Sequence, residues 1–178
     1  MAGEVLLVGA GVGSQSTPVS GYGRTYVDLT VQAASDGIIT DFRVALGTIC
    51  DLLKIGIVYG SAGMYTSRTF IERENVPSGV SVFDGLSIPV YAGDFLALYR
   101  YSTGVMVIDG LGSGTYNVIG DAFTGSPISY PNFNDSRSIS MAAYGTLASG
   151  GAGRLIGAKS RLIGGPSPLI GGPSPLIG

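Results

Sequence analysis

The side chains that most often carry enzyme chemistry are scarce in this chain of 178 residues. The sequence has no histidine and a single cysteine, Cys50. Histidine-dependent triads, the usual zinc sites and an intrachain disulfide are therefore excluded, because they need imidazole or more than one thiol. We expect Cys50 to be a small buried hydrophobic residue, with an intermolecular bridge or a reactive thiol as the alternative.

The twelve acidic residues are the remaining candidates for proton transfer. Asp94, Asp109 and Asp121 are the candidates for a carboxylate pair of the kind that glycosidases use. Each stands beside a glycine, and aspartate at such positions commonly accepts hydrogen bonds from the backbone of a turn. No D-x-D-x-D-G run predicts a calcium loop. We expect no enzymatic activity, no metal and no cofactor, and keep a glycoside- or ester-active enzyme as a rival hypothesis.

Ligands that carry phosphate are not predicted. Glycines at positions 9, 11 and 13 resemble a dinucleotide-binding fingerprint, but the third comes one residue early and a Ser-Gln-Ser-Thr-Pro run follows in place of a helix. The formal net charge of the chain is −2. Because an acidic chain has little attraction for a phosphate backbone, we expect no nucleic-acid partner.

Four of the ten tyrosines are candidates for contact with a ligand or another subunit. They are Tyr91, Tyr99, Tyr101 and Tyr130, which lie on predicted strands or at their ends. Tyrosine rings on a sheet can stack on sugar rings or fill a subunit interface. The alternative is ordinary packing across strands, and the absence of tryptophan weakens the case for a strong carbohydrate platform.

The elements that must position these residues are predicted to be strands. Apolar and polar residues alternate with a period of two, and 30 glycines with 9 prolines leave little room for long helices. The best helical rival, 47–54, is too short to change the class. An all-β fold, either an antiparallel sandwich or a barrel, is therefore predicted from strands at 25–33, 38–46, 52–59, 64–73, 80–83, 88–91, 95–101, 105–108, 116–119 and 138–147.

Strand pairing is predicted from the turn residues. The clearest strand, 25–33, alternates an apolar face with a face expected to be solvated, the latter made of Tyr26, Asp28, Thr30 and Gln32. Asp36-Gly37 is a hairpin-type turn, which predicts that 25–33 pairs with 38–46. A second hairpin is predicted to join 52–59 with 64–73.

The composition divides the chain into an N-terminal strand or arm at 1–24, a body at 25–147 and an arm at 148–178. The arm holds four seven-residue repeats, 151–157, 158–164, 165–171 and 172–178. Prolines in the last two repeats forbid a continuous helix, so the spacing does not predict a coiled coil and the backbone is expected to be extended.

Each repeat has adjacent leucine and isoleucine as its main apolar residues. These are Leu155, Ile156, Leu162, Ile163, Leu169, Ile170, Leu176 and Ile177. Residues 151–178 also carry three bases, including Arg154 and Arg161, and no acid, whereas the rest of the chain is acidic. We expect the arm to insert its Leu-Ile pairs into apolar sites on other subunits, with a mobile linker as the alternative.

The N-terminal sequence bears on location. It has an acid at Glu4 and no Lys or Arg before Arg24, so it does not resemble a secretory signal. No run of about 18 apolar residues predicts a membrane span. We expect synthesis in the cytosol and a final location in a virion or an extracellular filament.

Residues 80–99 carry a recognisable pattern. An apolar strand ends in PVYAGD at 89–94 and is followed by FLAL at 95–98. This resembles jelly-roll β-sandwich modules of bacteriophage virion proteins, including fibres and capsid decorations, and of bacterial surface proteins; C1q/TNF-like jelly rolls have a similar Gly-Asp turn. The resemblance covers about 25–147 and implies a jelly-roll-like sandwich that is non-enzymatic, oligomeric and exposed on a particle.

Residues and resemblance together favour a structural subunit of a virion or an extracellular filament. Its predicted partners are further copies of itself, as an oligomer such as a trimer or as a polymer, or another virion or fibre protein. The alternative is a carbohydrate-binding or adhesive surface module that contacts a surface glycan.

Overall fold

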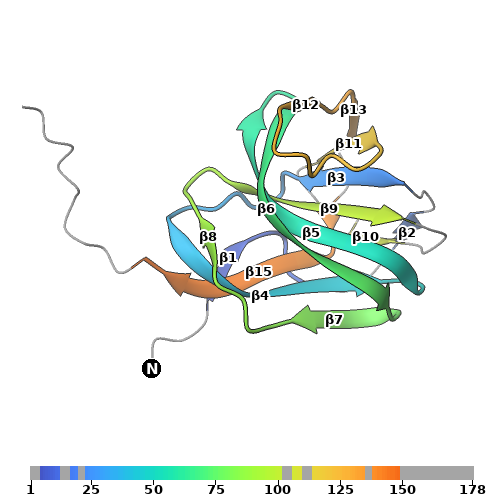
Figure 1. The fold of residues 1–178 in the computed structure, drawn as a ribbon, viewed down its shortest axis with the longest axis horizontal. Helices are drawn as coiled ribbons and strands as arrows, with labels where there is room; N and C mark the ends of the chain where they lie inside the picture. Colours follow the sequence, from blue (N-terminus) through green and yellow to red (C-terminus); the bar gives the residue numbers. More distant parts are fainter. Residues whose placement is uncertain are drawn as a thin grey trace, which may run out of the picture.

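The computed structural model describes residues 5–12, 17–19, 23–101, 106–109, 114–134 and 138–148 (Figure 1). These residues form an all-β fold in which two antiparallel sheets pack as a β-sandwich, and they contain no helix. The all-β prediction is therefore confirmed. All four repeats of the predicted arm lie outside the described residues.

The first sheet contains β1 (Val5–Val8), β2 (Thr17–Val19), β4 (Gly37–Leu46), β7 (Gly79–Phe83), β8 (Ile88–Val90), β10 (Met106–Asp109), β14 (Ser138–Ile139) and β15 (Met141–Leu147). Its main order is β1-β15-β4-β10-β14, and β2, β7 and β8 extend it by pairing with β10 or β4. β1 pairs with β15, so part of the predicted N-terminal strand or arm is an edge strand of the body.

The second sheet contains β3 (Arg24–Asp28), β5 (Cys50–Ser61), β6 (Met64–Val76), β9 (Phe95–Tyr101), β11 (Thr115–Ile119), β12 (Ile128–Ser129) and β13 (Asn132–Asn134). Its order is β12-β6-β5-β9-β3-β11-β13. The long β5–β6 hairpin, the twisted ribbon that crosses the front of Figure 1, confirms the hairpin predicted for 52–59 and 64–73. The short helical rival at 47–54 is absent, because β5 begins at Cys50.

The core between the sheets comes from strand faces that point at each other. Phe42 and Val44 of β4 are fully buried, as are Ile55 and Ile57 of β5 and Leu98 of β9, and all belong to one apolar cluster. Each such side chain contributes about 1.5–3 kcal/mol to folding by leaving water. This burial is the main force that holds the two sheets together.

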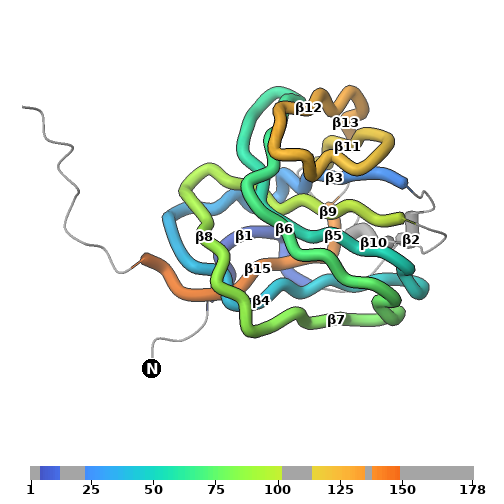
Figure 2. The backbone as a smooth tube through the Cα atoms, in the orientation of Figure 1, coloured from blue at the N-terminus to red at the C-terminus, as the bar shows by residue number. Residues whose placement is uncertain are grey.

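A second apolar cluster covers the opposite face of the second sheet. Residues 120–131 fold over this face, and Phe123 and Tyr130 belong to the same cluster as Val27 of β3 and Ala97 of β9. In Figure 2 this segment follows β11 across the top of the molecule. The middle of the second sheet is therefore covered on both sides, by the first sheet and by this segment.

Because both faces of the second sheet are covered, the prediction for 25–33 needs correction. The strand ends at Asp28, and Tyr26 and Asp28, expected to face water, are buried because their side of β3 points at the first sheet. Val27, on the other side, meets the second cluster. An alternating pattern identified a strand here but not which of its faces water reaches.

The predicted pairing of 25–33 with 38–46 is also wrong. β3 pairs with β9 and β11 in the second sheet, whereas β4 pairs with β15 in the first. The Asp36-Gly37 turn does not close a hairpin between them. Instead, Asp36 Oδ1 accepts a hydrogen bond from the Ala92 N–H at 2.9 Å, and its carbonyl oxygen accepts one from the Ala148 N–H at 3.0 Å.

Asp28 is the buried carboxyl group that links the two sheets. Its Oδ1 accepts a hydrogen bond from the Thr30 N–H at 2.9 Å, and its Oδ2 accepts one from the Ile139 N–H of β14 at 3.3 Å. Burial raises the pKa of Asp28 above its usual value of 3.8, although these hydrogen bonds oppose the rise. The native state therefore keeps this proton to a higher pH than the unfolded chain does.

We expect Asp28 to make the protein less stable as the pH rises from about 4 toward neutral. Between the unfolded and native pKa values the native state binds more protons, so the free energy of unfolding falls by up to about 1.4 kcal/mol per pH unit. Urea titrations of wild type and Asp28→Asn between pH 3.5 and 7.5 measure this. The stability of wild type should decline relative to Asp28→Asn, and a difference that does not change with pH would contradict the prediction.

Candidate functional site

The β8–β9 turn, which carries the PVYAGD pattern, crosses from the first sheet to the second. Its Gly93 has φ +92°, a conformation that side chains disfavour, and its N–H donates to the Ala33 carbonyl at 2.8 Å. The Asp94 carboxylate accepts a hydrogen bond from the Tyr91 N–H at 3.0 Å. Asp94 is only 1% exposed, and its carboxylate binds the backbone of its own turn.

Arg68 of β6 is the cation that pairs with Asp94. Its Nε lies 2.9 and 3.0 Å from the two carboxylate oxygens. The pairing of β5 with β6 steps from Ile57–Thr69 to Val58–Ser67, so Arg68 has no opposite residue and is the bulged position. Because a bulge changes the direction of a side chain, it explains how Arg68 reaches the turn.

Two tyrosine rings lie against the Arg68 guanidinium. Its central carbon is 4.1 Å from the ring centre of Tyr59 and 4.9 Å from that of Tyr91. Both rings are more than two-fifths exposed. We call Tyr59, Arg68, Tyr91 and Asp94 the tyrosine–arginine cluster. It presents aromatic surface and a guanidinium held in place by a buried carboxylate, which is a combination suited to contact with a polar, ring-shaped ligand such as a sugar.

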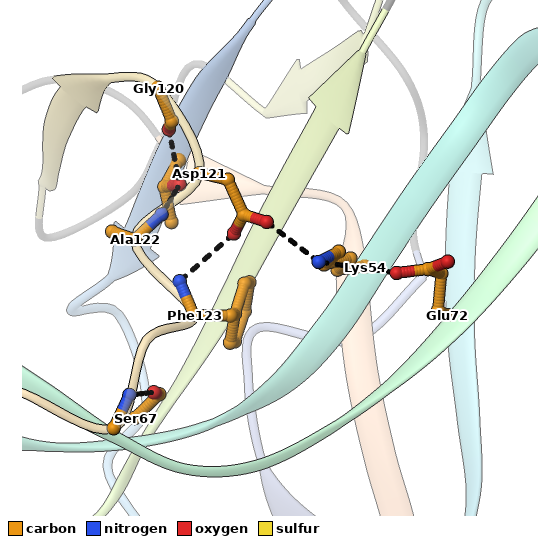
Figure 3. Close-up of polar contacts among 9 residues, drawn as sticks. Lys54, Ser67, Glu72, Gly120, Asp121, Ala122 and Phe123 are labelled. Atoms are coloured by element: carbon orange, nitrogen blue, oxygen red, sulfur yellow. Dashed lines mark hydrogen bonds and ion pairs between the residues drawn. The ribbon is translucent and has the colours of Figure 1, made fainter.

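Asp121 lies elsewhere, in the segment that covers the second sheet (Figure 3). Its Oδ2 is 2.6 Å from Lys54 Nζ, and its Oδ1 accepts a hydrogen bond from the Phe123 N–H at 2.9 Å. Lys54 also pairs with Glu72 at 3.1 Å. The bond to Asp121 is the main reason that the pKa of Lys54 is raised.

The start of the same segment is held by Thr25 of β3. The Thr25 hydroxyl donates to the Gly120 carbonyl at 2.8 Å and accepts a hydrogen bond from the Ala122 N–H at 2.9 Å. Further along, the Gly125 N–H donates to Ser67 Oγ at 2.9 Å (Figure 3). These polar contacts fix the segment over its apolar cluster, which accounts for the position of Asp121.

The three candidate acids are thus placed as follows. Asp94 and Asp121 each bind one cation and one backbone N–H, as the turn-residue alternative predicts. Asp109 ends β10, and its side chain lies outside what the structure describes. In the described part of the chain no three His, Cys, Asp or Glu side chains gather where a metal ion would bind.

The four candidate tyrosines separate into two groups. Tyr99 and Tyr130 are buried in the second apolar cluster, where Tyr130 packs edge-on against Tyr65 at 5.6 Å between ring centres. Burial raises the pKa of both phenols. Tyr91 and Tyr101 are exposed, but only Tyr91 belongs to the tyrosine–arginine cluster. Tyr99 and Tyr130 are therefore used in packing, whereas Tyr91 and Tyr101 are exposed enough to contact a ligand or another subunit.

Cys50 is buried in the core between the sheets, as predicted. Its Sγ donates a hydrogen bond to the Leu52 carbonyl at 3.2 Å, and burial raises the pKa of its thiol. A raised pKa keeps the thiol protonated and unreactive at neutral pH.

The departure point of the arm is defined, although the arm itself is not described. β15 ends at Leu147 in the first sheet, and the next residue, Ala148, is bonded through its N–H to Asp36. The predicted docking residues of the arm, from Arg154 to Ile177, lie beyond this point and outside the described residues.

Sequence reasoning missed two features of the surface. Arg68 carried no signal, because its role depends on a bulge and on a turn 26 residues away. The exposed edge of β7 was also missed, although Val80 and Val82 are 59% and 52% exposed. Their alternation with small residues predicts a strand but does not show whether anything covers it.

Comparison with known proteins assigns the chain to no family. No protein-family model matches the chain, and no curated protein matches it. In the part of the chain that the structure describes, no helix is long and apolar enough to cross a membrane. The only class to which the chain is assigned is therefore that of all-β proteins with a sandwich of antiparallel sheets.

Proposed function

We propose that this protein is a structural subunit of a virion or an extracellular filament, which assembles when its C-terminal arm binds neighbouring copies. The observation that carries the proposal is the place of the repeats after the body. The last described residues are Leu147, which ends β15 in the first sheet, and Ala148, which is bonded to Asp36, and 28 residues of repeat sequence follow shortly after. A sequence of this composition has too little apolar matter to form a core of its own.

The length of the arm favours binding to other copies. Thirty extended residues, 149–178, span about 90 Å at about 3.1 Å per residue. A body of this size has a diameter of roughly 40 Å. An extended arm is therefore about twice as long as the body is wide, which gives it the reach to contact a neighbouring copy.

The energy of such docking comes from many small contributions. One Leu-Ile pair that buries about 200 Å² of apolar surface gains roughly 3–5 kcal/mol before the cost of ordering the arm is subtracted. Four linked pairs on one arm bind far more tightly than one, because each docked pair raises the local concentration of the next. The basic repeats also complement the acidic body, although salt screens this attraction.

Sedimentation velocity of the full-length chain tests the proposal. A variant in which all eight Leu and Ile residues of the repeats become Ser is expected to lose self-association. The matched control exchanges Leu and Ile within each repeat, which keeps the apolar area and should keep self-association. Unchanged assembly of the Ser variant would show that the arm is not the connector, and labelling with a specific antibody in electron micrographs of native particles tests the location.

The tyrosine–arginine cluster favours a second candidate function, that of a carbohydrate-binding or adhesive module. Two exposed rings beside a fixed guanidinium give the stacking and hydrogen-bonding groups that sugars need. Glycan arrays probed with the full chain should then show binding that Tyr91→Ala abolishes and Tyr101→Ala leaves intact. Equal binding by both variants would exclude this cluster.

A further inference from the structure

The two sheets protect their outer edges differently. In the second sheet β12 pairs with β6 only at Met64 and Tyr65, and the rest of that edge of β6 carries charges at Arg68, Glu72, Arg73 and Glu74, which discourage pairing with another chain. The edge strand β7 of the first sheet has the sequence GVSVF and no charge. Among the described residues β7 pairs only with β4, so its other edge has no strand beside it.

β7 also exposes its apolar side chains more than β1, the edge strand at the other side of the first sheet. Val80 and Val82 are 59% and 52% exposed, whereas Val5 and Leu6 of β1 are 39% and 42% exposed. In Figure 1, β7 lies at the lower margin of the molecule, below β4. An uncharged, β-branched edge of this kind is a template for an added strand.

The repeats of the arm have a backbone that suits an added strand. In an extended chain, the N–H and C=O groups of alternate residues point to the same edge. Within 165–171, Pro166 and Pro168 therefore lie on one edge together with Ile170, and Leu169 lies on the other edge with the remaining residues. One edge keeps every N–H, while the other lacks two.

The last repeat has the same arrangement, since Pro173 and Pro175 remove two N–H groups from one edge of 172–178, which we call the blocked edge. The first two repeats have no proline, but Arg154 and Arg161 place a charge on the corresponding edge, where the second proline stands in the last two. Proline and charged residues are the usual means of preventing further pairing at a sheet edge. A docked repeat would thus pair along its open edge and close the sheet along its blocked one.

We propose that the edge of β7 is the acceptor for the arm, and that a repeat from a second copy of this chain adds to it as a strand. This inference rests on the proposed function, since it names the site and the mode of the same assembly. In each repeat the N–H and C=O groups of the leucine then point to the pairing edge of the arm, together with those of small residues. The N–H and C=O groups of the isoleucine point to the blocked edge, which also holds proline or arginine.

Two full-length variants of the arm distinguish strand addition from insertion of side chains. Leu169→Pro with Leu176→Pro removes two N–H groups from the pairing edge, whereas Ile170→Pro with Ile177→Pro removes two from the edge that is already blocked. Each loses two apolar side chains and gains two prolines. We expect the leucine variant to raise the dissociation constant for self-association at least tenfold and the isoleucine variant less than threefold, and equal effects would overturn strand addition.

Variants of the body test the acceptor. Val80→Lys with Val82→Lys should weaken self-association at least tenfold, because lysine on an edge strand opposes pairing. Ile119→Lys is the control: Ile119 is 73% exposed on β11 of the second sheet, and its variant should assemble as wild type does within twofold. Circular dichroism confirms that each variant is folded.

The outcomes separate this inference from the proposed function. If replacing the arm's Leu and Ile by Ser abolishes self-association but the β7 variant assembles as wild type, β7 is not the acceptor while the proposed function stands. Loss of assembly in Leu6→Lys alone would assign the acceptor to β1 and also overturn the inference. If the Ser variant itself assembles normally, the proposed function fails first.

Discussion

Replacing Phe42 by alanine is expected to lower the free energy of unfolding by about 3–5 kcal/mol. Phe42 is fully buried in the core between the sheets, on the strand that pairs with β15 on one side and β7 on the other. Its removal takes a large apolar ring out of the core and leaves a cavity that the paired strands around it cannot fill. Urea unfolding followed by circular dichroism measures the change.

The control for this prediction is a surface position. Ile119→Ala, at a side chain that is 73% exposed, should change the free energy of unfolding by less than about 0.5 kcal/mol. A Phe42→Ala protein as stable as wild type would mean that the two sheets do not pack through β4. The same result would also mean that the core between the two sheets contributes little to the stability of the body.

Replacing Asp94 by alanine is expected to cost about 2–3 kcal/mol of stability. The substitution removes the carboxylate that accepts the Tyr91 N–H and pairs with Arg68, at a position that is 1% exposed. The Arg68 side chain is about one-third exposed and can regain water, which is why the cost stays below that of breaking a fully buried pair. Urea unfolding measures the loss.

A double-mutant cycle shows whether the loss comes from the pair. Arg68→Ala, Asp94→Ala and the double variant should give a coupling energy of about 1 kcal/mol or more. Additive effects would mean that Asp94 acts through the turn backbone alone. The measurement also bears on the rival enzyme hypothesis, because a hydrolytic activity abolished by Asp94→Asn in a protein that remains folded would require a chemical role for this carboxylate.

Local signals predicted those parts of the fold that depend on neighbouring residues. The β5–β6 hairpin follows from two alternating segments separated by four small residues, so its partners are close in sequence. The burial of Cys50 follows from its place in an apolar segment of a chain with no second cysteine. The repeats of the arm are visible directly, since repetition is a property of the sequence itself.

Pairing between distant strands was beyond local signals. Asp36-Gly37 has the residues of a tight turn, yet the strands on either side of it enter different sheets. The partners of β3 are β9 and β11, which lie roughly 70 to 90 residues away. Turn propensity describes a few residues, whereas the choice of sheet depends on which distant strands bury the most apolar surface together.

The candidate site likewise has parts that local signals predict and parts that depend on distant strands. The PVYAGD pattern predicted a turn and placed Asp94 in it, and the structure puts the carboxylate on the backbone of that turn. The partner cation could not be predicted, because Arg68 reaches Asp94 only through a bulge in β6, a strand of the β5–β6 hairpin. The difference between Tyr130 and Tyr91 likewise depends on the tertiary structure: Tyr130 is buried because its own segment, 120–131, packs onto the second sheet, whereas Tyr91 in the β8–β9 turn stays exposed.

The sequence by itself determined that the chain is built of strands, that one hairpin joins β5 to β6 and that a repeated arm follows the body. The tertiary structure alone decided which strand faces are buried, which carboxylates find cations and that no second described strand pairs with β7. The physical reason is range: alternation and turn chemistry act over a few residues, whereas burial and pairing depend on segments that meet only once the sheets have formed.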